Sequence, residues 1–99
     1  MKFRVEYSGG ARANFAAYID YLRASGAPER YVVRWYENIL ATAEDLQERP
    51  YRGMVDDGAS SEAGFEVRRL IVRPYVILYA VDEKSHVVMI IAIVHGAMD

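Results

Sequence analysis

Three arginines in the C-terminal third of the chain could bind an anionic group. Arg68, Arg69 and Arg73 lie in or directly after an apolar segment that is typical of a strand. Successive side chains of a strand point to opposite faces, so Arg68 and Arg69 cannot hold one phosphate together. Arg69 shares a side with Ile71 and Arg73, and an arginine pair at that spacing could bind a carboxylate or a phosphate. The alternative role is a cross-strand ion pair with a nearby acid: Glu66, Asp82 or Glu83.

Two tyrosines and one histidine are the other candidates for chemistry. Tyr75 and Tyr79 share a strand face, which favours a place in the core with the hydroxyl groups at its rim. Stacking on a nucleic-acid base or assistance to proton transfer is the functional alternative. His95 ends the last apolar run beside Gly96, where general acid/base chemistry or a structural role is open to it.

The sequence has no pattern that indicates a metal or a cofactor. Asp56, Asp57 and Glu62 have no histidine or cysteine partner and belong to an acidic stretch that we expect to be solvated. A glycine-rich phosphate loop and a Ser/His/Asp set are both missing. We therefore expect no cofactor and no metal site.

The N-terminal half predicts one strand followed by a helical hairpin. Residues 2–7 alternate charged and apolar side chains, the period of a half-buried strand. Residues 10–24 carry apolar side chains at helical spacing, and a second helix is predicted from Pro28 up to Pro50. Helices joined by so few residues pack antiparallel. Residues 51–64 show no periodicity and are predicted to be a loop.

The C-terminal part predicts a three-strand antiparallel meander. Its strands are expected at residues 66–72, 75–83 and 86–94, joined by tight turns. The fold class is therefore α+β, in the order β-α-α-β-β-β. One domain, residues 1–99, is expected to pack a helical hairpin on a mainly antiparallel four-stranded sheet.

Both faces of the last two strands are apolar, although one hairpin can cover only one face. Strict alternation places Ile91 and Ile93 on the side opposite Val88 and Ile90. A second cover is needed because a large exposed apolar surface is typical of an interaction site. A partner segment, a homodimer and closure by the predicted loop are the alternatives. The candidate residues for partner contact are Val76, Leu78 and Ala80.

Composition restricts the compartment and the class of ligand. The chain has 99 residues, 12 basic and 14 acidic side chains, and no cysteine. Proteins that grip nucleic acid over a broad surface are usually strongly basic, so this balance argues against such binding. The absence of cysteine, of a signal-like N-terminus and of a long apolar run predicts a cytoplasmic protein that does not cross a membrane.

The C-terminal motifs, in their order, resemble the closing meander of the RelE/ParE superfamily. These toxins belong to bacterial type II toxin–antitoxin (plasmid stabilisation) systems. The resemblance implies the same order of elements and a cognate antitoxin that wraps the toxin. The matching motifs are Arg68-Arg69-Leu70, Pro74-Tyr75 with Tyr79, and His95-Gly96.

The resemblance also suggests the activity. RelE-like members cut messenger RNA on the ribosome with an arginine after the first tyrosine of a Tyr-x-x-x-Tyr strand, where this chain has Val76. Many relatives carry another arginine near the end of the His-Gly motif, where Met98 stands here. ParE-like members share the motifs and poison DNA gyrase without catalysis. We therefore expect a ParE-like gyrase inhibitor. The alternatives are a RelE-like endoribonuclease and an inactive interaction domain of the same fold. The candidate target-binding residues are Arg68, Arg69, Arg73, Tyr75 and His95.

Overall fold

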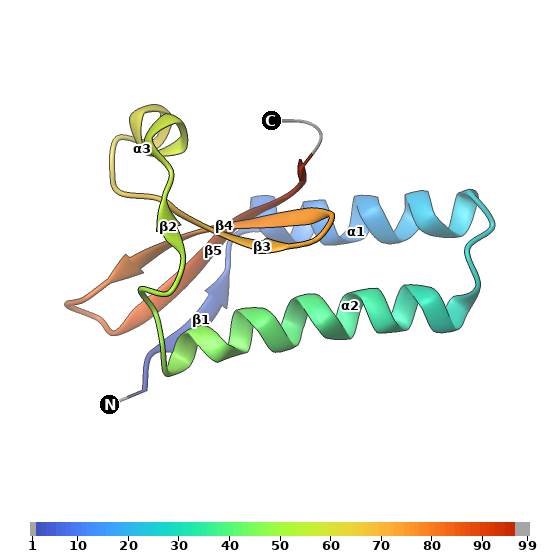
Figure 1. The fold of residues 1–99 in the computed structure, drawn as a ribbon, viewed down its shortest axis with the longest axis horizontal. Coiled ribbons are helices and arrows are strands. Elements are labelled where there is room, and N and C mark those ends of the chain that lie inside the picture. Colours follow the sequence, from blue (N-terminus) through green and yellow to red (C-terminus); the bar gives the residue numbers. More distant parts are fainter. Residues whose placement is uncertain (1, 97–99) are drawn as a thin grey trace.

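A five-stranded sheet and two long helices make up most of the molecule (Figure 1). The computed structural model describes residues 2–96. The sheet order is β1-β5-β4-β3-β2, with β1 parallel to β5 and all other neighbours antiparallel. The predicted α+β class and the place of the first strand beside the meander are confirmed. The elements are β1 (Arg4–Tyr7), α1 (Gly9–Ala24), α2 (Glu29–Glu44) with the short 3-10 helix Asp45–Gln47, β2 (Met54–Val55), α3 (Asp57–Ala63), β3 (Arg68–Val72), β4 (Tyr75–Asp82) and β5 (Val87–His95).

The prediction of a structureless loop at residues 51–64 is wrong. This segment contains the two-residue strand β2, which makes the sheet five-stranded, and the seven-residue helix α3. The side chain of Asp56 accepts a hydrogen bond from the Ala59 N–H at 2.9 Å and so caps the start of α3. Gly64, with φ of 81°, ends it in the left-handed conformation. None of the residues of α3 is buried, so its sequence carries no apolar periodicity that could have revealed it.

A β-bulge in β5 corrects the predicted faces of the last strand. Tyr79 pairs with Ile90 but Leu78 pairs with Ala92, so Ile91 is an extra residue. Beyond the bulge the alternation is reversed, and Ile93 is buried in the core together with Val88 and Ile90.

Polar side chains at and beyond the start of α1 stabilise the bulge and the rest of β5. Ser8 donates to the Ile91 carbonyl oxygen at 2.8 Å while also accepting from the first turn of α1. β1 pairs with β5 only as far as Ile90. Further along, Asn14 Oδ1 accepts the Ile93 N–H, and Tyr18 Oη accepts the His95 N–H, each at 2.9 Å. These side chains satisfy backbone groups that a longer β1 would have paired.

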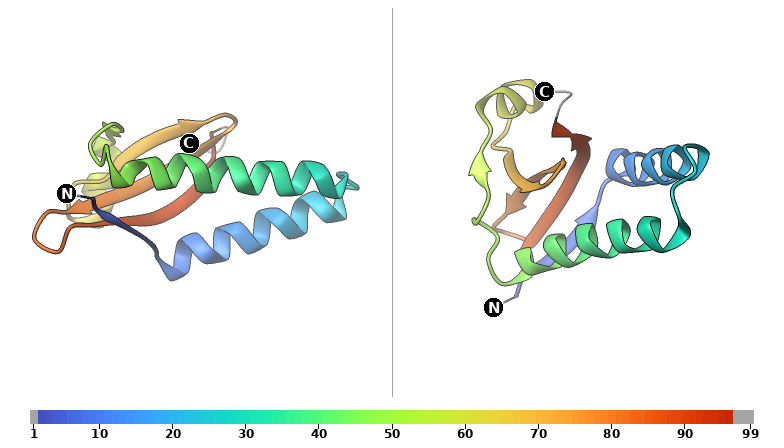
Figure 2. Two further views of the ribbon diagram at one scale, coloured as in Figure 1. Left: turned by 90° about the horizontal axis from the view of Figure 1, so that it is seen from below. Right: turned by 45° about the vertical axis from the view of Figure 1, so that its right-hand side comes forward.

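Helices α1 and α2 cover one face of the sheet and extend beyond it (Figure 2). Between them and the sheet lies the core. The radius of gyration is 13.6 Å, against about 12.6 Å for a compact domain of this length. The accessible surface of 6326 Å² also exceeds the roughly 5,700 Å² expected for this mass. No helix within residues 2–96 is both long and apolar enough to cross a bilayer. The buried core residues include Phe15, Leu22, Trp35, Ile39, Leu46, Leu70, Ile77 and Tyr79.

Candidate interaction site on the open sheet face

We call the sheet face that is turned away from α1 and α2 the open face. In the register of the strands, Arg69 lies beside Leu78, Ile71 lies beside Val76, and Ala80 lies beside Met89. No helix of the described part of the chain lies across this face, although α3 stands at one end of it (Figures 1 and 2). The predicted absence of helical cover on one face is therefore confirmed.

The apolar surface of the open face is uneven. Val76 is only 7 % exposed and Leu78 and Ala80 are half-buried, so Val76 can contribute little further area to a contact. Ile71 is 56 % exposed. Met54 on β2 and Phe65 before β3 are also exposed, at 69 % and 55 %. Neither was a candidate in the sequence, because Met54 lies in the predicted loop of residues 51–64 and Phe65 directly follows it.

One end of the open face is a shallow basic hollow of about 400 Å³. The predicted candidates Arg69, Arg73, Tyr75 and His95 all line it, together with Val76. In residues 2–96, no ion pair joins Arg69 or Arg73 to an acid. Two guanidinium groups that stand on or beside one rigid strand without counter-charges are suited to bind a carboxylate or a phosphate.

Arg68 lies on the opposite side of β3 and has a different environment. Its guanidinium donates to the Gly53 carbonyl oxygen at 2.8 Å and to the Tyr51 carbonyl oxygen at 3.3 Å. It also forms an ion pair with one of the predicted acids, Glu66, at 3.2 Å, but Glu66 lies two residues earlier in the same segment and not on a neighbouring strand. The guanidinium lies 4.9 Å from the centre of the Tyr51 ring. Arg68 thus fixes the chain before β2 against β3, and it is the one target-binding candidate that does not line the basic hollow.

Gly53 and Tyr79 form a buried contact that the sequence did not reveal. The Gly53 N–H donates to Tyr79 Oη at 2.8 Å. A β-carbon on Gly53 would lie 2.6 Å from that oxygen and 2.6 Å from the Arg69 carbonyl oxygen. Only glycine fits there, so this position fixes how closely β2 approaches the strand that carries Arg69.

Tyr75 and His95 join the basic hollow to the core. The Tyr75 ring makes edge-to-face contacts with Tyr18, Trp35 and His95, with ring centres 5.1, 5.2 and 5.4 Å apart. Burial, followed by the nearby Tyr31, Tyr18 and Tyr21, raises the pKa of Tyr75. The phenol is therefore neutral at physiological pH, and its place is that of a rigid aromatic wall, as predicted for a core tyrosine.

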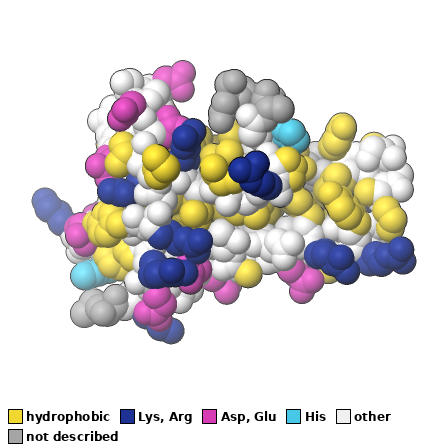
Figure 3. All heavy atoms as spheres, viewed as in Figure 1, with side chains coloured by type: hydrophobic (Ala, Val, Ile, Leu, Met, Phe, Trp, Pro, Cys, Tyr) yellow, Lys and Arg dark blue, Asp and Glu magenta, His cyan; other side chains and the backbone are white. Residues whose placement is uncertain are grey.

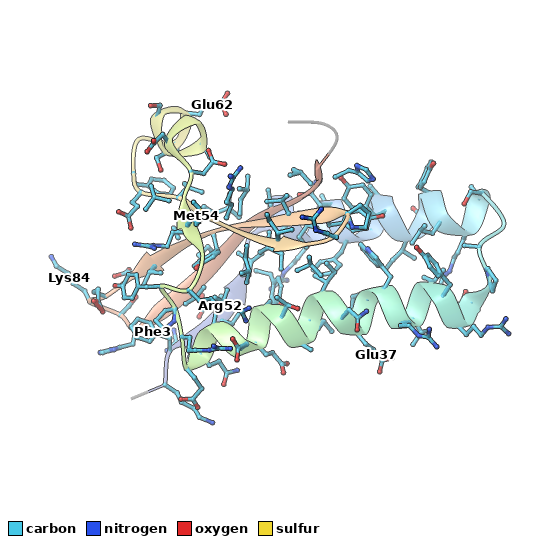
Figure 4. The ribbon with its side chains drawn as sticks, in the orientation of Figure 1. Phe3, Glu37, Arg52, Met54, Glu62 and Lys84 are labelled. Carbon is cyan, nitrogen blue, oxygen red and sulfur yellow. The ribbon has the colours of Figure 1, made fainter. Side chains whose placement is uncertain are left out.

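The other end of the open face is a hollow of about 500 Å³ that carries the opposite charge. Glu66, Asp82 and Glu83 line this acidic hollow with one base, Lys84. Hydrogen bonds from Ser85, then from the Lys84 backbone, lower the pKa of Asp82 and keep it ionised. Figure 4 shows Met54, Glu62 and Lys84 at this end of the molecule, and Figure 3 shows acidic side chains gathered over α3. The apolar lining comes from Phe65, Ala80, Val81 and Met89.

The described residues contain no group of three or more histidines, cysteines, aspartates or glutamates that could hold a metal ion. The basic hollow instead offers two cations, aromatic edges and apolar surface. Met98, which the motif comparison singled out, lies outside the described residues.

Comparison with known proteins identifies the family of the chain. Residues 5–99 match the family described as the ParE toxin of the type II toxin–antitoxin system, parDE. The chain belongs to the ParE toxin family. It is thus a toxin of a type II toxin–antitoxin system, with the ParE/RelE fold.

Two solved structures with the same fold are toxin–antitoxin systems. A chain of the chromosomal ParDE system from P. aeruginosa is similar with a TM-score of 0.74 at 17% identity, over 95% of this chain and 96% of that one. A chain of the toxin–antitoxin complex RelBE2 from Mycobacterium tuberculosis is similar with a TM-score of 0.60 at 18% identity, over 96% of this chain and 99% of that one. A search of curated proteins found no match. At these identities the structural similarity shows the fold of the ParE-family toxin and not its target.

Proposed function

We propose that this ParE-family toxin inhibits DNA gyrase in the cytoplasm and is neutralised by a cognate antitoxin that covers the open face. The observation that carries the proposal is the basic hollow. Arg69 and Arg73 share it without a counter-charge from residues 2–96, beside exposed apolar surface. Such a surface favours a protein partner, since it combines a hydrophobic centre with charge-assisted hydrogen bonds.

The residues that line the basic hollow favour inhibition by binding over RNA cleavage. In this hollow, the strand position Val76 is apolar where the resemblance to RelE implies an arginine. Cleavage of RNA needs positive groups that stabilise the phosphorane-like transition state, and the loss of one preorganised donor costs about 10²- to 10³-fold in rate. The net charge of −2 also disfavours wide contacts with RNA.

Endoribonuclease activity remains the second candidate because of one observation. Arg69, Arg73, Tyr75 and His95 converge on a single hollow, and arginines beside aromatic rings also suit a nucleotide. Two assays on the wild-type protein separate the candidates. We expect the purified toxin to inhibit DNA supercoiling by gyrase, and we expect primer extension on cellular transcripts to show no codon-dependent cuts. Cuts without an effect on gyrase would reverse the assignment, and a lack of both activities would indicate an inactive interaction domain.

The antitoxin part of the proposal has its own test. Leu78→Glu places a charge in the middle of the open face, and Val33→Glu places one on the exposed outer side of α2, where Val33 is 47 % exposed. The toxin should be co-expressed with the product of the adjacent gene and the complex isolated. We expect Val33→Glu to keep the complex and Leu78→Glu to lose it, and thermal melts of both free variants show that each is folded at the assay temperature. A complex that survives Leu78→Glu would place the antitoxin elsewhere.

A further inference from the structure

The two ends of the open face are complementary to each other. The basic hollow carries Arg69 and Arg73, which gives a charge of about +2, and the acidic hollow carries Glu66, Asp82 and Glu83 with Lys84. Glu66 is already paired with Arg68, so the acidic hollow keeps a smaller net negative charge. Their volumes, about 400 and 500 Å³, are similar. Between them lies apolar surface from β3, β4 and β5 that no described helix covers. One surface therefore contains both halves of an electrostatic pair.

A twofold axis can bring these halves together. The axis lies in the plane of contact between two copies and is perpendicular to the long direction of the open face. Rotation about it places the basic end of each copy against the acidic end of the other. In such an isologous contact every pair of residues occurs twice. We propose that the open face binds a second copy of the same chain, with Arg73 of each protomer in the acidic hollow of its partner. This inference goes beyond gyrase inhibition and does not depend on it.

The lining of the acidic hollow suits a guanidinium group. Phe65 is 55 % exposed there and offers an aromatic face, on which arginine stacks well. Glu83 and Glu66 are exposed at its rim. Glu66 already contacts Arg68, and the Asp82 carboxylate accepts the backbone N–H groups of Lys84 and Ser85. Each carboxylate has lone pairs for further bonds, so an incoming arginine need not break these contacts.

The size of the open face predicts a weak, reversible dimer. β4 has eight residues, which at about 3.3 Å each and about 4.8 Å between strands gives roughly 500 Å² for a face four strands wide. Two copies then bury about 1,000 Å², below the 1,600 Å² of a standard stable interface. Dimerisation should thus depend on concentration. Because the dimer hides Arg69 and Arg73, it would compete with the antitoxin and with the target for the same surface.

Sedimentation equilibrium of the full chain tests the inference with a pair of charge reversals. Arg73→Glu and Glu83→Arg each place like charges in both contacts of a homodimer, so each variant alone should dimerise at least tenfold more weakly than the wild type. An equimolar mixture restores opposite charges in both contacts of the heterodimer, so dimers should return. Arg34→Glu, on the exposed outer side of α2, is the matched control and should behave as the wild type.

The outcomes are distinct. Recovery of dimers on mixing, together with weakening in 1 M NaCl, supports the inference because salt at that concentration screens charges beyond about 3 Å. A wild-type protein that stays monomeric at millimolar concentration overturns it. Variants that dimerise as the wild type does, or a mixture that stays monomeric although both variants melt at the wild-type temperature, also overturn it. None of these results bears on gyrase inhibition, which is measured separately.

Discussion

The buried contact between Gly53 and Tyr79 predicts a large effect from one methyl group. In Gly53→Ala the new β-carbon would lie 2.6 Å from Tyr79 Oη, 2.6 Å from the Arg69 carbonyl oxygen and 2.8 Å from Tyr79 Cε1. Overpacking of this kind costs about 1–3 kcal/mol, and weakening of the 2.8 Å hydrogen bond adds about 0.5–1.5 kcal/mol. We expect a loss of about 2–4 kcal/mol in the free energy of unfolding.

A double-mutant cycle tests the contact between Gly53 and Tyr79. Tyr79→Phe removes the acceptor of the Gly53 N–H and should cost about 1–3 kcal/mol. In the double variant the missing hydroxyl group relieves one of the close contacts. The free energy of unfolding lost in the double variant should therefore be smaller than the sum of the two single losses by about 1 kcal/mol or more. Urea unfolding can be followed by the fluorescence of Trp35, the one tryptophan of the chain, which is buried in the core.

A matched glycine supplies the control. A β-carbon on Gly9 would have nothing within 4 Å, so Gly9→Ala should leave the stability unchanged or slightly raise it. At about 4–8 °C per kcal/mol, Gly53→Ala should melt at least about 10 °C lower than Gly9→Ala. A Gly53→Ala protein within about 0.5 kcal/mol of the wild type, or a strictly additive cycle, would refute the packing described for β2.

Three further predictions concern other contacts. Asn14→Ala leaves the Ile93 N–H without its acceptor and should cost about 1–3 kcal/mol in urea unfolding, whereas Asn14→Asp keeps an oxygen at that place and should cost clearly less. Arg68→Ala loses two bonds to backbone carbonyl oxygens and should lower the melting temperature, whereas Arg69→Ala should leave it within about 2–4 °C of the wild type; equal melting of the two would contradict their assigned roles. Burial, then the charges of Glu44 and Tyr36, raises the pKa of Tyr7 to about 12, so the stability due to neutral Tyr7 is complete below about pH 10 and is lost as the pH rises through 10 to 12. The circular dichroism signal of the folded protein should therefore fall less steeply with rising pH in Tyr7→Phe than in the wild type over that range. The same pH profile for both proteins would contradict this.

Much of the fold could be predicted because its signals are local. The two long helices and the three C-terminal strands show clear periodicity, and tight turns force the strands into a meander. The shared side of Arg69, Ile71 and Arg73 followed from simple alternation, which holds because β3 contains no bulge. The gathering of four target-binding candidates around one hollow also follows from that alternation and from the pairing of Tyr75 with His95.

The features that sequence reasoning missed depend on residues far apart in the chain. The bulge at Ile91 is held by Ser8 and followed by a contact with Asn14, about 80 positions earlier, so nothing near Ile91 announces it. α3 is short, has no buried residue and carries no periodic signal. The requirement for glycine at position 53 exists only once β2 meets the Tyr79 ring. Glu66, Asp82 and Glu83 were predicted only as partners for an ion pair, and the hollow that they share was missed because Glu66 precedes β3, whereas Asp82 and Glu83 follow one another at the end of β4.

The most direct measurement compares gyrase inhibition by two double variants of the purified toxin. Arg69→Ala/Arg73→Ala removes the unpaired cations of the basic hollow, and Arg30→Ala/Arg34→Ala removes two exposed arginines of α2 as the matched control. Each charge-assisted hydrogen bond is worth about 1.5–3 kcal/mol, so loss of two should weaken inhibition by at least about 10²-fold. The control should inhibit as the wild type does, with both variants melting near the wild-type temperature. A folded Arg69→Ala/Arg73→Ala protein that inhibits gyrase at full strength would contradict the assignment of the open face as the functional surface.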